Sequence, residues 1–280
     1  MPDILITKAN GEKEPFDVVK LEHSLRKSQA PDELVDKVAK HILLELKSGM
    51  STDEIYRRAF SFLHTLEKPI AMRYSLKRAI MDLGPSGFPF EQLIASIFKK
   101  LGYDVETDKI VSGGCADHEV DIIAYNDKKL IMVEAKYHNN VGLNSDLKVA
   151  LYIKARFEDL AESLFHYGND GKERKLDEGW LVTNTKFTSS AIKYAECQRL
   201  TLVGWNYPLH DNLHDLIEKT ALHPLTCLTT LTATQKQFLL SKSMVVCTDI
   251  RNNKTLLHEA GLSPADIETV DREIDLLYKS

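Results

Sequence analysis

Charged and polar side chains recur at every second position in the stretch LIMVEAKYH, where Glu134, Lys136 and His138 follow an apolar run. Side chains of a β-strand alternate between its two faces, so these three are expected to share one face. Asp121 stands in VDIIAY, an apolar segment that is also typical of a strand. Two carboxylates could bind a divalent cation, and a nearby lysine could stabilise the negative charge that develops when a phosphodiester bond is hydrolysed.

The turn between the two strands decides which residues face one another. With Asp127 and Lys128 as a two-residue turn, the numbers of paired residues sum to 255, which places Asp121 directly opposite Glu134. Opposed side chains lie about 4.5–5.5 Å apart at Cβ, and like charges at that separation repel one another. Because Mg²⁺ or Mn²⁺ between the carboxylates would remove this repulsion, we expect a metal site formed by Asp121 and Glu134.

A helix that precedes the strands supplies a further carboxylate. The segment FEQLIASIFKKLGYDV carries an apolar stripe at helical spacing. Glu91 lies three and seven residues before Ile94 and Phe98, so it borders the stripe that the helix buries. We therefore expect Glu91 to approach the strands that carry the metal site.

The simpler interpretation of the strand residues is an exposed polar face. Taken alone, Glu134 and Lys136 would favour that interpretation. Their combination with Asp121 and Glu91 favours a catalytic site instead. His138 is interpreted as a flanking polar residue outside the catalytic set.

The first part of the chain predicts a β-hairpin followed by a small helical bundle. Asn10-Gly11 is a strong hairpin turn signal, because both residues tolerate positive φ. The helical patterns that follow cover residues 17–28 and 32–47, a segment opening at the capping box STDE (51–54), and a segment from Pro69 to Gly84.

The stretch ITKANGEKEPFDVVK resembles the opening of an ATP-cone, a nucleotide-sensing domain found at the start of many ribonucleotide reductases. The matching positions are Lys8, Gly11, Phe16, Asp17 and Lys20, whereas Ala9 and Asn10 depart from the family's usual Arg and Asp. The resemblance covers roughly residues 3–90. It implies that ATP or dATP binds as an effector at Lys8, Asn10, Gly11 and Lys20, where lysines and hairpin amides would contact phosphates. The alternative is a helical interaction domain with solvated lysines.

The central segment resembles the PD-(D/E)xK nucleases, in the branch of the Mrr-type restriction endonucleases. Asp121 followed by Glu134-Ala135-Lys136 matches the acid–acid–lysine motif, and Glu91 matches an additional acidic residue of this branch. The segment WLVTNTKFTSSAIKYA (180–195) resembles the branch's later strand and helix, so the similarity covers about residues 88–208. The resemblance implies metal-dependent DNA hydrolysis that leaves a 5′-phosphate and a 3′-hydroxyl, with a role in host defence.

Two further polar segments of this region have open interpretations. Residues 183–185 (Thr-Asn-Thr) could bind phosphate oxygens, and turn formation explains them equally well. A helix over residues 147–164, with Lys154 and Arg156, is interpreted as structural with an edge that could face DNA.

Composition places the chain among ordinary globular proteins. It is 43% hydrophobic and 28% charged, with a formal net charge of −5, so it is not a basic nucleic-acid-binding protein that depends on bulk charge. No apolar run approaches the ~20 residues of a membrane span, and the start lacks a secretory signal. The four cysteines are far apart without a C-x-x-C pair, which favours a reducing cytoplasm.

The last part of the chain is expected to be helical. Ser263 is a predicted N-cap before Pro264. The stretch NKTLLHEAGLSPADIETV faintly resembles helix-hairpin-helix modules that bind DNA backbone, but its acidity favours a packing or oligomerisation element. Whether the chain forms a homo-oligomer is left open.

Together these patterns predict an α/β protein with a mixed-sheet, restriction-endonuclease-like core. We expect an ATP-cone-like domain over residues 1–87, a nuclease domain over 88–222 and a helical region over 223–280. The predicted function is a metal-dependent DNA endonuclease regulated by a nucleoside triphosphate. The alternatives are a non-catalytic, nucleotide-responsive DNA-binding regulator and a repair or junction-resolving nuclease on the same fold.

Overall fold

The structure is a computed structural model that describes residues 4–168 and 171–278. The described residues divide into two compact units. The first contains residues up to Ala79, Thr226–Lys236 and those from Ile250 onward; the second contains Ile80–Leu225 and Gln237–Asp249. Within the described ranges, no helix combines the length and the apolar character that a membrane span requires.

The first unit opens with the predicted hairpin, formed by β1 (Leu5–Thr7) and β2 (Lys13–Pro15). Its turn is closed by a hydrogen bond from the Gly11 amide to the Lys8 carbonyl, and Gly11 has a φ of +84°, which glycine adopts without strain. The amide of Thr7 donates to the carbonyl of Met50, so the hairpin is also held by the loop before the third helix.

The helical bundle beside this hairpin is stabilised by side-chain caps. It comprises α1 (Val18–Lys27), α2 (Asp32–Glu45), α3 (Thr52–Leu66), α4 (Lys68–Tyr74) and α5 (Leu76–Met81). The Asp17 carboxylate accepts from the Val19 amide, and the Ser51 hydroxyl accepts from the Glu54 amide, as the capping box predicts. Leu25, Val38 and Leu63 are among the fully buried core residues.

The single helix expected after Pro69 is instead two short helices, α4 and α5, which meet at Ser75. The Ser75 hydroxyl donates to the Met72 carbonyl, a bond that competes with the backbone ladder. The expectation of one continuous helix was therefore wrong at this position.

The C-terminal helices are α10 (Ala233–Ser241), α11 (Cys247–Arg251), α12 (Lys254–Glu259) and α13 (Pro264–Tyr278). The Ser263 hydroxyl accepts from the Asp266 amide, which confirms the predicted cap. Helix α13 packs against α4 of the first unit, where Lys68 forms an ion pair with Glu273 at 3.0 Å.

Among the described residues, the second unit holds a five-stranded mixed sheet in the order β11-β9-β5-β4-β3. Strands β3 (Asp104–Ser112), β4 (Asp117–Tyr125) and β5 (Leu130–Lys136) are antiparallel. Strands β9 (Glu178–Thr183) and β11 (Thr201–Val203) continue from β5 in parallel. Short pairs join β6 (Asn144–Ser145) to β10 (Lys186–Phe187) and β7 (Phe165–His166) to β8 (Glu173–Arg174).

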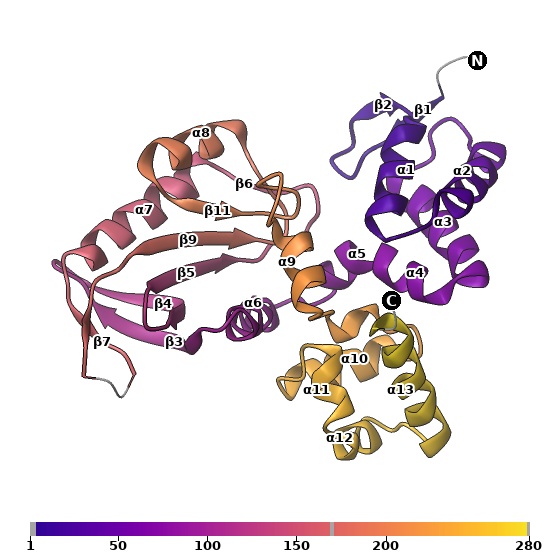
Figure 1. The fold of residues 1–280 in the computed structure, drawn as a ribbon. Helices are drawn as coiled ribbons and strands as arrows, with labels where there is room; N and C mark the ends of the chain where they lie inside the picture. Colours follow the sequence, from indigo (N-terminus) through magenta and orange to yellow (C-terminus); the bar gives the residue numbers. More distant parts are fainter. Residues whose placement is uncertain (1–3, 169–170, 279–280) are drawn as a thin grey trace. The chain divides into compact units, whose positions relative to one another are not determined.

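Helices cover both faces of this sheet (Figure 1). Helix α6 (Phe88–Lys100) lies on one face, and α7 (Leu147–Ala161) and α8 (Ser189–Gln198) lie on the other; α9 (Leu213–Thr220) packs against α6. This arrangement confirms the predicted α/β class with a mixed sheet, an N-terminal hairpin and bundle, and C-terminal helices.

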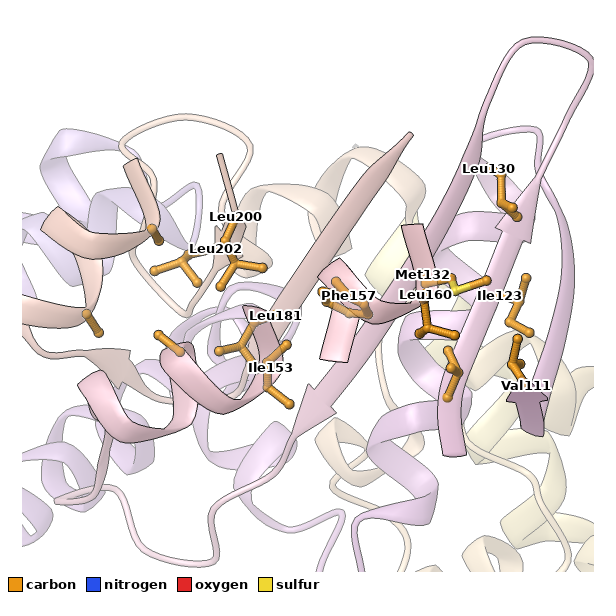
Figure 2. Close-up of a cluster of buried hydrophobic side chains, with 14 of the residues drawn as sticks. Val111, Ile123, Leu130, Met132, Ile153, Phe157, Leu160, Leu181, Leu200 and Leu202 are labelled. Atoms are coloured by element: carbon orange, nitrogen blue, oxygen red, sulfur yellow. The ribbon is translucent and has the colours of Figure 1, made fainter. Parts of the chain in front are cut away.

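The core between α7 and the sheet sets the position of that helix (Figure 2). Ile153, Phe157 and Leu160 of α7 pack with strand residues such as Met132 and Leu181. A Cβ atom at Gly179 would lie 2.3 Å from the Phe157 ring, so only glycine lets this ring rest directly on β9. Close packing here fixes the neighbouring residues of α7 over the end of β5.

Candidate active site

The pairing of β4 with β5 agrees with the register expected from the sequence. The ladder runs from Tyr125↔Leu130 to Ile122↔Val133, and each pair sums to 255. The Asn126 side chain accepts hydrogen bonds from the amides of Lys128 and Lys129, which stabilises the tight turn. Continued by one position, this register sets Asp121 beside Glu134.

At Asp121, a hydrogen bond to the side chain replaces the next backbone bond of the ladder between β4 and β5. In the alternating antiparallel pattern, the amide of Ala135 would donate to the backbone of β4. It donates instead to the Asp121 carboxylate at 2.7 Å. On the other edge of β4, the ladder with β3 omits the pair of Asp108 and Asp121, and Asp108 has a left-handed φ of +53°. The Asp121 carboxylate is therefore held against β5 where both neighbouring ladders are interrupted.

Glu134 is a mostly buried carboxylate beside this aspartate. Its side chain is 18% exposed, and its Oε2 accepts a hydrogen bond from Nη1 of Arg156 at 2.5 Å. Burial and the charge of Asp121 raise the pKa of Glu134 to about 7, although Arg156 and Lys136 act in the opposite direction. A carboxyl that holds its proton near neutral pH is one that a cation would stabilise in the charged form.

The pKa values of Glu91 and Asp121 are raised as well. Burial, together with the charges of Asp121, Asp108 and Glu134, raises the pKa of Glu91 to about 7. Burial also raises the pKa of Asp121, against the bond from the Ala135 amide. The carboxylates of Glu91, Asp121 and Glu134 are thus close enough to repel one another.

Helix α6 brings Glu91 to this position from its first turn. A Cβ atom at Gly87 would lie 3.0 Å from Oε1 of Glu91, so the glycine leaves room for this carboxylate. Lys136 is exposed at the end of β5, and its charge lowers the pKa of both Glu134 and His138. The four residues predicted to be catalytic thus gather where the C-terminal end of β5 lies beside the middle of β4.

The donor set fits a hard divalent cation with several waters. The hydrogen bonds of Asp121 and Glu134 use Oδ2 and Oε2, respectively. Among the described residues, the second oxygen of each carboxylate accepts no hydrogen bond. Such a pair suits Mg²⁺ or Mn²⁺, which bind to proteins through few carboxylates and retain water. Over residues 4–168 and 171–278, no group of three or more His, Cys, Asp or Glu side chains has an arrangement that could itself enclose a metal ion.

The segment Thr183-Asn184-Thr185 is structural. All three residues are at most 2% exposed, because β9 lies between β5 and β11. The Asn184 side chain accepts from the His138 amide and donates to the His138 carbonyl, both at 2.8 Å. Of the two interpretations left open, turn formation is the one the burial supports, and the segment fixes the loop that leaves β5.

In the second unit, Arg156 was not connected with the predicted catalytic residues by the sequence analysis. It was assigned to a structural helix, yet its guanidinium contacts Glu134. One signal was present: Arg156 stands three residues after Ile153 and directly before Phe157, so it borders the buried stripe of α7.

A small cavity lies between the hairpin and the bundle of the first unit. It has a volume of about 160 Å³ and is lined by Ile6, Glu14, Phe16, Asp17, Lys20, Leu21, Thr52, Ile55, Tyr56 and Tyr74. Of the residues predicted to bind nucleotide, only Lys20 lines it. Lys8 lies beside the cavity wall, at 3.9 Å from Glu14, whereas Asn10 and Gly11 form the exposed turn.

Both lysines are already paired with glutamates. Lys20 lies 3.2 Å from Glu14, and Lys8 lies 2.8 Å from Glu12. Glu14 was not singled out from the sequence, although it faces both predicted phosphate-binding lysines. A bound phosphate would compete with this carboxylate for the two lysines.

Three family models match successive parts of the chain. An ATP cone domain matches residues 4–82, a restriction endonuclease domain matches 84–149, and the C-terminal region of AF1548-like proteins matches 223–278. The predicted order of an ATP-cone and an Mrr-type restriction endonuclease domain is confirmed. Arg156 lies beyond the matched endonuclease segment.

Known proteins are also similar to parts of this chain. An uncharacterized protein of Archaeoglobus fulgidus is 33% identical over 171 residues, which cover 61% of this chain and 91% of that protein. The crystal structure of the protein of unknown function AF1548 is 30% identical, with a TM-score of 0.53, over 68% of this chain and 97% of that one. The MspJI restriction endonuclease, solved with a 27-mer oligonucleotide, is 13% identical with a TM-score of 0.36, over 62% of this chain and 35% of its own. On identity and coverage, the chain belongs to the AF1548-like family, with an ATP-cone domain followed by a restriction endonuclease domain.

Proposed function

We propose that this protein is a metal-dependent DNA endonuclease whose activity responds to a nucleoside triphosphate bound by its ATP-cone. The observation that carries the proposal is the placement of Asp121 beside Glu134, with Lys136 following on β5. Burial raises the pKa of both carboxyls, and the charge of Asp121 raises that of Glu134 as well, so the charged pair is costly to the fold unless a cation uses it.

In this proposal, Asp121 and Glu134 would hold Mg²⁺ or Mn²⁺, and the cation would supply Lewis-acid chemistry at water and at the scissile phosphate. Lys136 stabilises the negative charge that accumulates on the phosphate oxygens during hydrolysis. Glu91, with a pKa raised to about 7, can exchange a proton with solvent near neutral pH. As in similar nucleases, the products would be a 5′-phosphate and a 3′-hydroxyl.

The regulatory part of the proposal rests on the first unit. ATP or dATP would bind at the hairpin, with its phosphates at Lys8 and Lys20 in place of Glu14. The match to a restriction endonuclease domain supports a role in defence against foreign DNA.

Plasmid cleavage tests both parts. The wild-type protein should cut supercoiled DNA with Mg²⁺ or Mn²⁺ and not with EDTA, and ATP or dATP should change the rate by about 5–150-fold, the usual range of allosteric coupling. Glu134→Ala serves as the inactive control. A folded wild-type protein that binds DNA but never cuts it would identify a non-catalytic regulator instead. Cleavage restricted to branched DNA would identify a junction-resolving nuclease.

A further inference from the structure

Arg156 makes four contacts around the carboxylate of Glu134. Its Nη1 donates to Oε2 of Glu134 at 2.5 Å and to the Glu119 carbonyl at 3.0 Å. Its Nη2 donates to the Tyr152 hydroxyl at 3.1 Å, and its guanidinium carbon lies 5.0 Å from the centre of the Tyr152 ring. The Arg156 side chain is only 13% exposed.

Most of these contacts do not depend on Glu134. The Glu119 carbonyl belongs to β4, and Tyr152 lies one turn before Arg156 on α7. Phe157, the next residue, rests on β9 at Gly179. Three of the four contacts therefore hold the guanidinium independently of Glu134.

Arg156 bonds only one of the two carboxylate oxygens of Glu134. Arg156 occupies Oε2, whereas Oε1 accepts no hydrogen bond within the described part of the chain. A guanidinium that neutralised the carboxylate would use both oxygens in a fork-to-fork pair. Here one N–H holds one oxygen, which restricts the rotation of the carboxylate and leaves the other oxygen available for a ligand.

Burial of this arginine has a cost that a packing role does not explain. Its Nε is buried and has no hydrogen-bond partner in the structure as described. A buried donor without a partner destabilises the fold, so an apolar residue would fill the same space at lower cost. Partners of metal ligands commonly carry such a cost because they orient the ligand.

We infer that Arg156 is a positioning residue of the nuclease site: it holds Oε2 of Glu134 so that Oε1 binds the divalent cation. This inference rests on the proposed metal-dependent function. For the affinity of the site for a cation, it predicts the opposite of what charge alone would predict. Removing a positive charge beside a cation site should tighten cation binding, whereas removing a positioning residue should weaken it.

Calorimetric titration of the DNA-free protein with Mn²⁺ separates these two signs without measuring cleavage. Arg156→Met should bind Mn²⁺ about 10–100-fold more weakly than wild type. Arg156→Lys keeps the charge and can still donate a hydrogen bond, so its Mn²⁺ affinity should lie between those of wild type and Arg156→Met. Tyr152→Phe keeps the ring beside Arg156 and should change the affinity by less than the methionine variant.

Arg174→Met is the matched control. Arg174 also donates to a strand-end carbonyl, that of Asn126 at 2.7 Å, and lies 5.9 Å from the Tyr125 ring, but it makes no contact with Glu134. It should bind Mn²⁺ like wild type. Circular dichroism checks folding, and where Arg156→Met does not fold, Arg156→Lys carries the test.

The outcomes distinguish the inference from the proposed function. Equal or tighter Mn²⁺ binding by the folded Arg156 variants, with wild-type protein that binds Mn²⁺ and cuts DNA, overturns the positioning role and leaves the nuclease intact. Mn²⁺ binding by wild type that Glu134→Ala does not weaken overturns both, because the cation then does not use Glu134.

Discussion

The carboxylate of Asp121 accepts a hydrogen bond from the main-chain amide of Ala135 at 2.7 Å, where the ladder between β4 and β5 ends. This bond ties one acidic residue of the site to the backbone of the strand that carries the other. It also separates two roles of Asp121, because the bond needs only an oxygen acceptor, whereas cation binding needs a negative charge.

The first prediction uses this separation. Asp121→Asn keeps an oxygen that can accept from Ala135 and removes the repulsion with Glu134, so the protein should fold at least as stably as wild type. Cleavage should fall by about 10³-fold, which corresponds to about 4 kcal/mol of transition-state stabilisation. Plasmid cleavage and thermal unfolding measure the two effects. Substantial cleavage by the folded asparagine variant would remove Asp121 from the metal site.

The second prediction concerns the ExK residues on β5. Glu134→Ala and Lys136→Ala should each abolish cleavage and leave the circular dichroism spectrum unchanged, since the first removes a proposed cation ligand and the second a charge at the phosphate. Lys128→Ala is the control, because Lys128 is an exposed lysine in the turn of the same hairpin. If the control loses as much activity as Lys136→Ala, the lysine effect is general charge and not a specific role.

The third prediction is a pH dependence of metal binding. Burial and the charge of Asp121 raise the pKa of Glu134 to about 7, so protons compete with the cation below that pH. Mn²⁺ affinity and the cleavage rate should both rise between about pH 6 and pH 8. Titration calorimetry at several pH values gives the affinity. A flat profile for the wild-type protein would contradict a cation bound through Glu134.

The same shift predicts how pH affects the metal-free fold. A carboxyl whose folded-state pKa is raised from 4.5 contributes stability that is fully present below pH 4.5 and is lost as the pH rises through about 7. The loss for Glu134 is on the order of 3 kcal/mol, at about 1.4 kcal/mol per pKa unit. In EDTA, Glu134→Gln should therefore gain stability relative to wild type as the pH rises from 4.5 to 7, as thermal unfolding would show.

The fourth prediction concerns the cavity beside the hairpin. Glu14 lies 3.2 Å from Lys20, and its charge opposes a phosphate at the same place. Glu14→Gln should tighten ATP or dATP binding by about 3–10-fold, or about 0.7–1.4 kcal/mol, and Lys20→Ala should weaken it. Lys13→Ala, on the same hairpin and outside the cavity lining, is the control. Unchanged affinity in both test variants would place the nucleotide elsewhere.

The fifth prediction tests a buried acid in the first unit. Glu273 is 1% exposed, lies 3.0 Å from Lys68, and accepts from the amides of Thr229 and Thr230. Glu273→Gln breaks the ion pair and should lower the free energy of unfolding by several kcal/mol at pH 7. Removal of one partner of a buried ion pair typically destabilises a protein by about 3–5 kcal/mol. Glu268→Gln on the exposed side of α13 is the control.

The pH dependence of this variant has the opposite sign to that of Glu134. Burial raises the pKa of Glu273, but hydrogen bonds from Thr229 and Lys68 outweigh it, and the net pKa is lowered from 4.5. The stabilisation is therefore present above pH 4.5 and is lost as the pH falls through the folded-state value. The difference between wild type and Glu273→Gln should shrink in acid. A difference that does not shrink as the pH is lowered would contradict the ion-pair assignment.

Much of the site's geometry follows from short stretches of sequence. The tight turn after Tyr125 and the period-two alternation of β5 suffice to pair Ile122 with Val133, because a hairpin register depends only on nearby residues. The position of Glu91 beside an apolar stripe likewise follows from helical periodicity alone. The hairpin at Gly11 and the caps at Ser51 and Ser263 are also local features, and all were predicted correctly.

The remaining features depend on how whole elements pack. The bond between Arg156 and Glu134 joins residues of α7 and β5, and it forms because Phe157 seats α7 on Gly179 of a third element. Asn184 and its neighbours are buried because β9 lies inside the sheet, which their polarity does not reveal. The ion pair between Glu273 and Lys68 joins residues that are far apart in the sequence. Such contacts are decided by the packing of surfaces distant in sequence, and periodicity within one element carries no information about which surface it will meet.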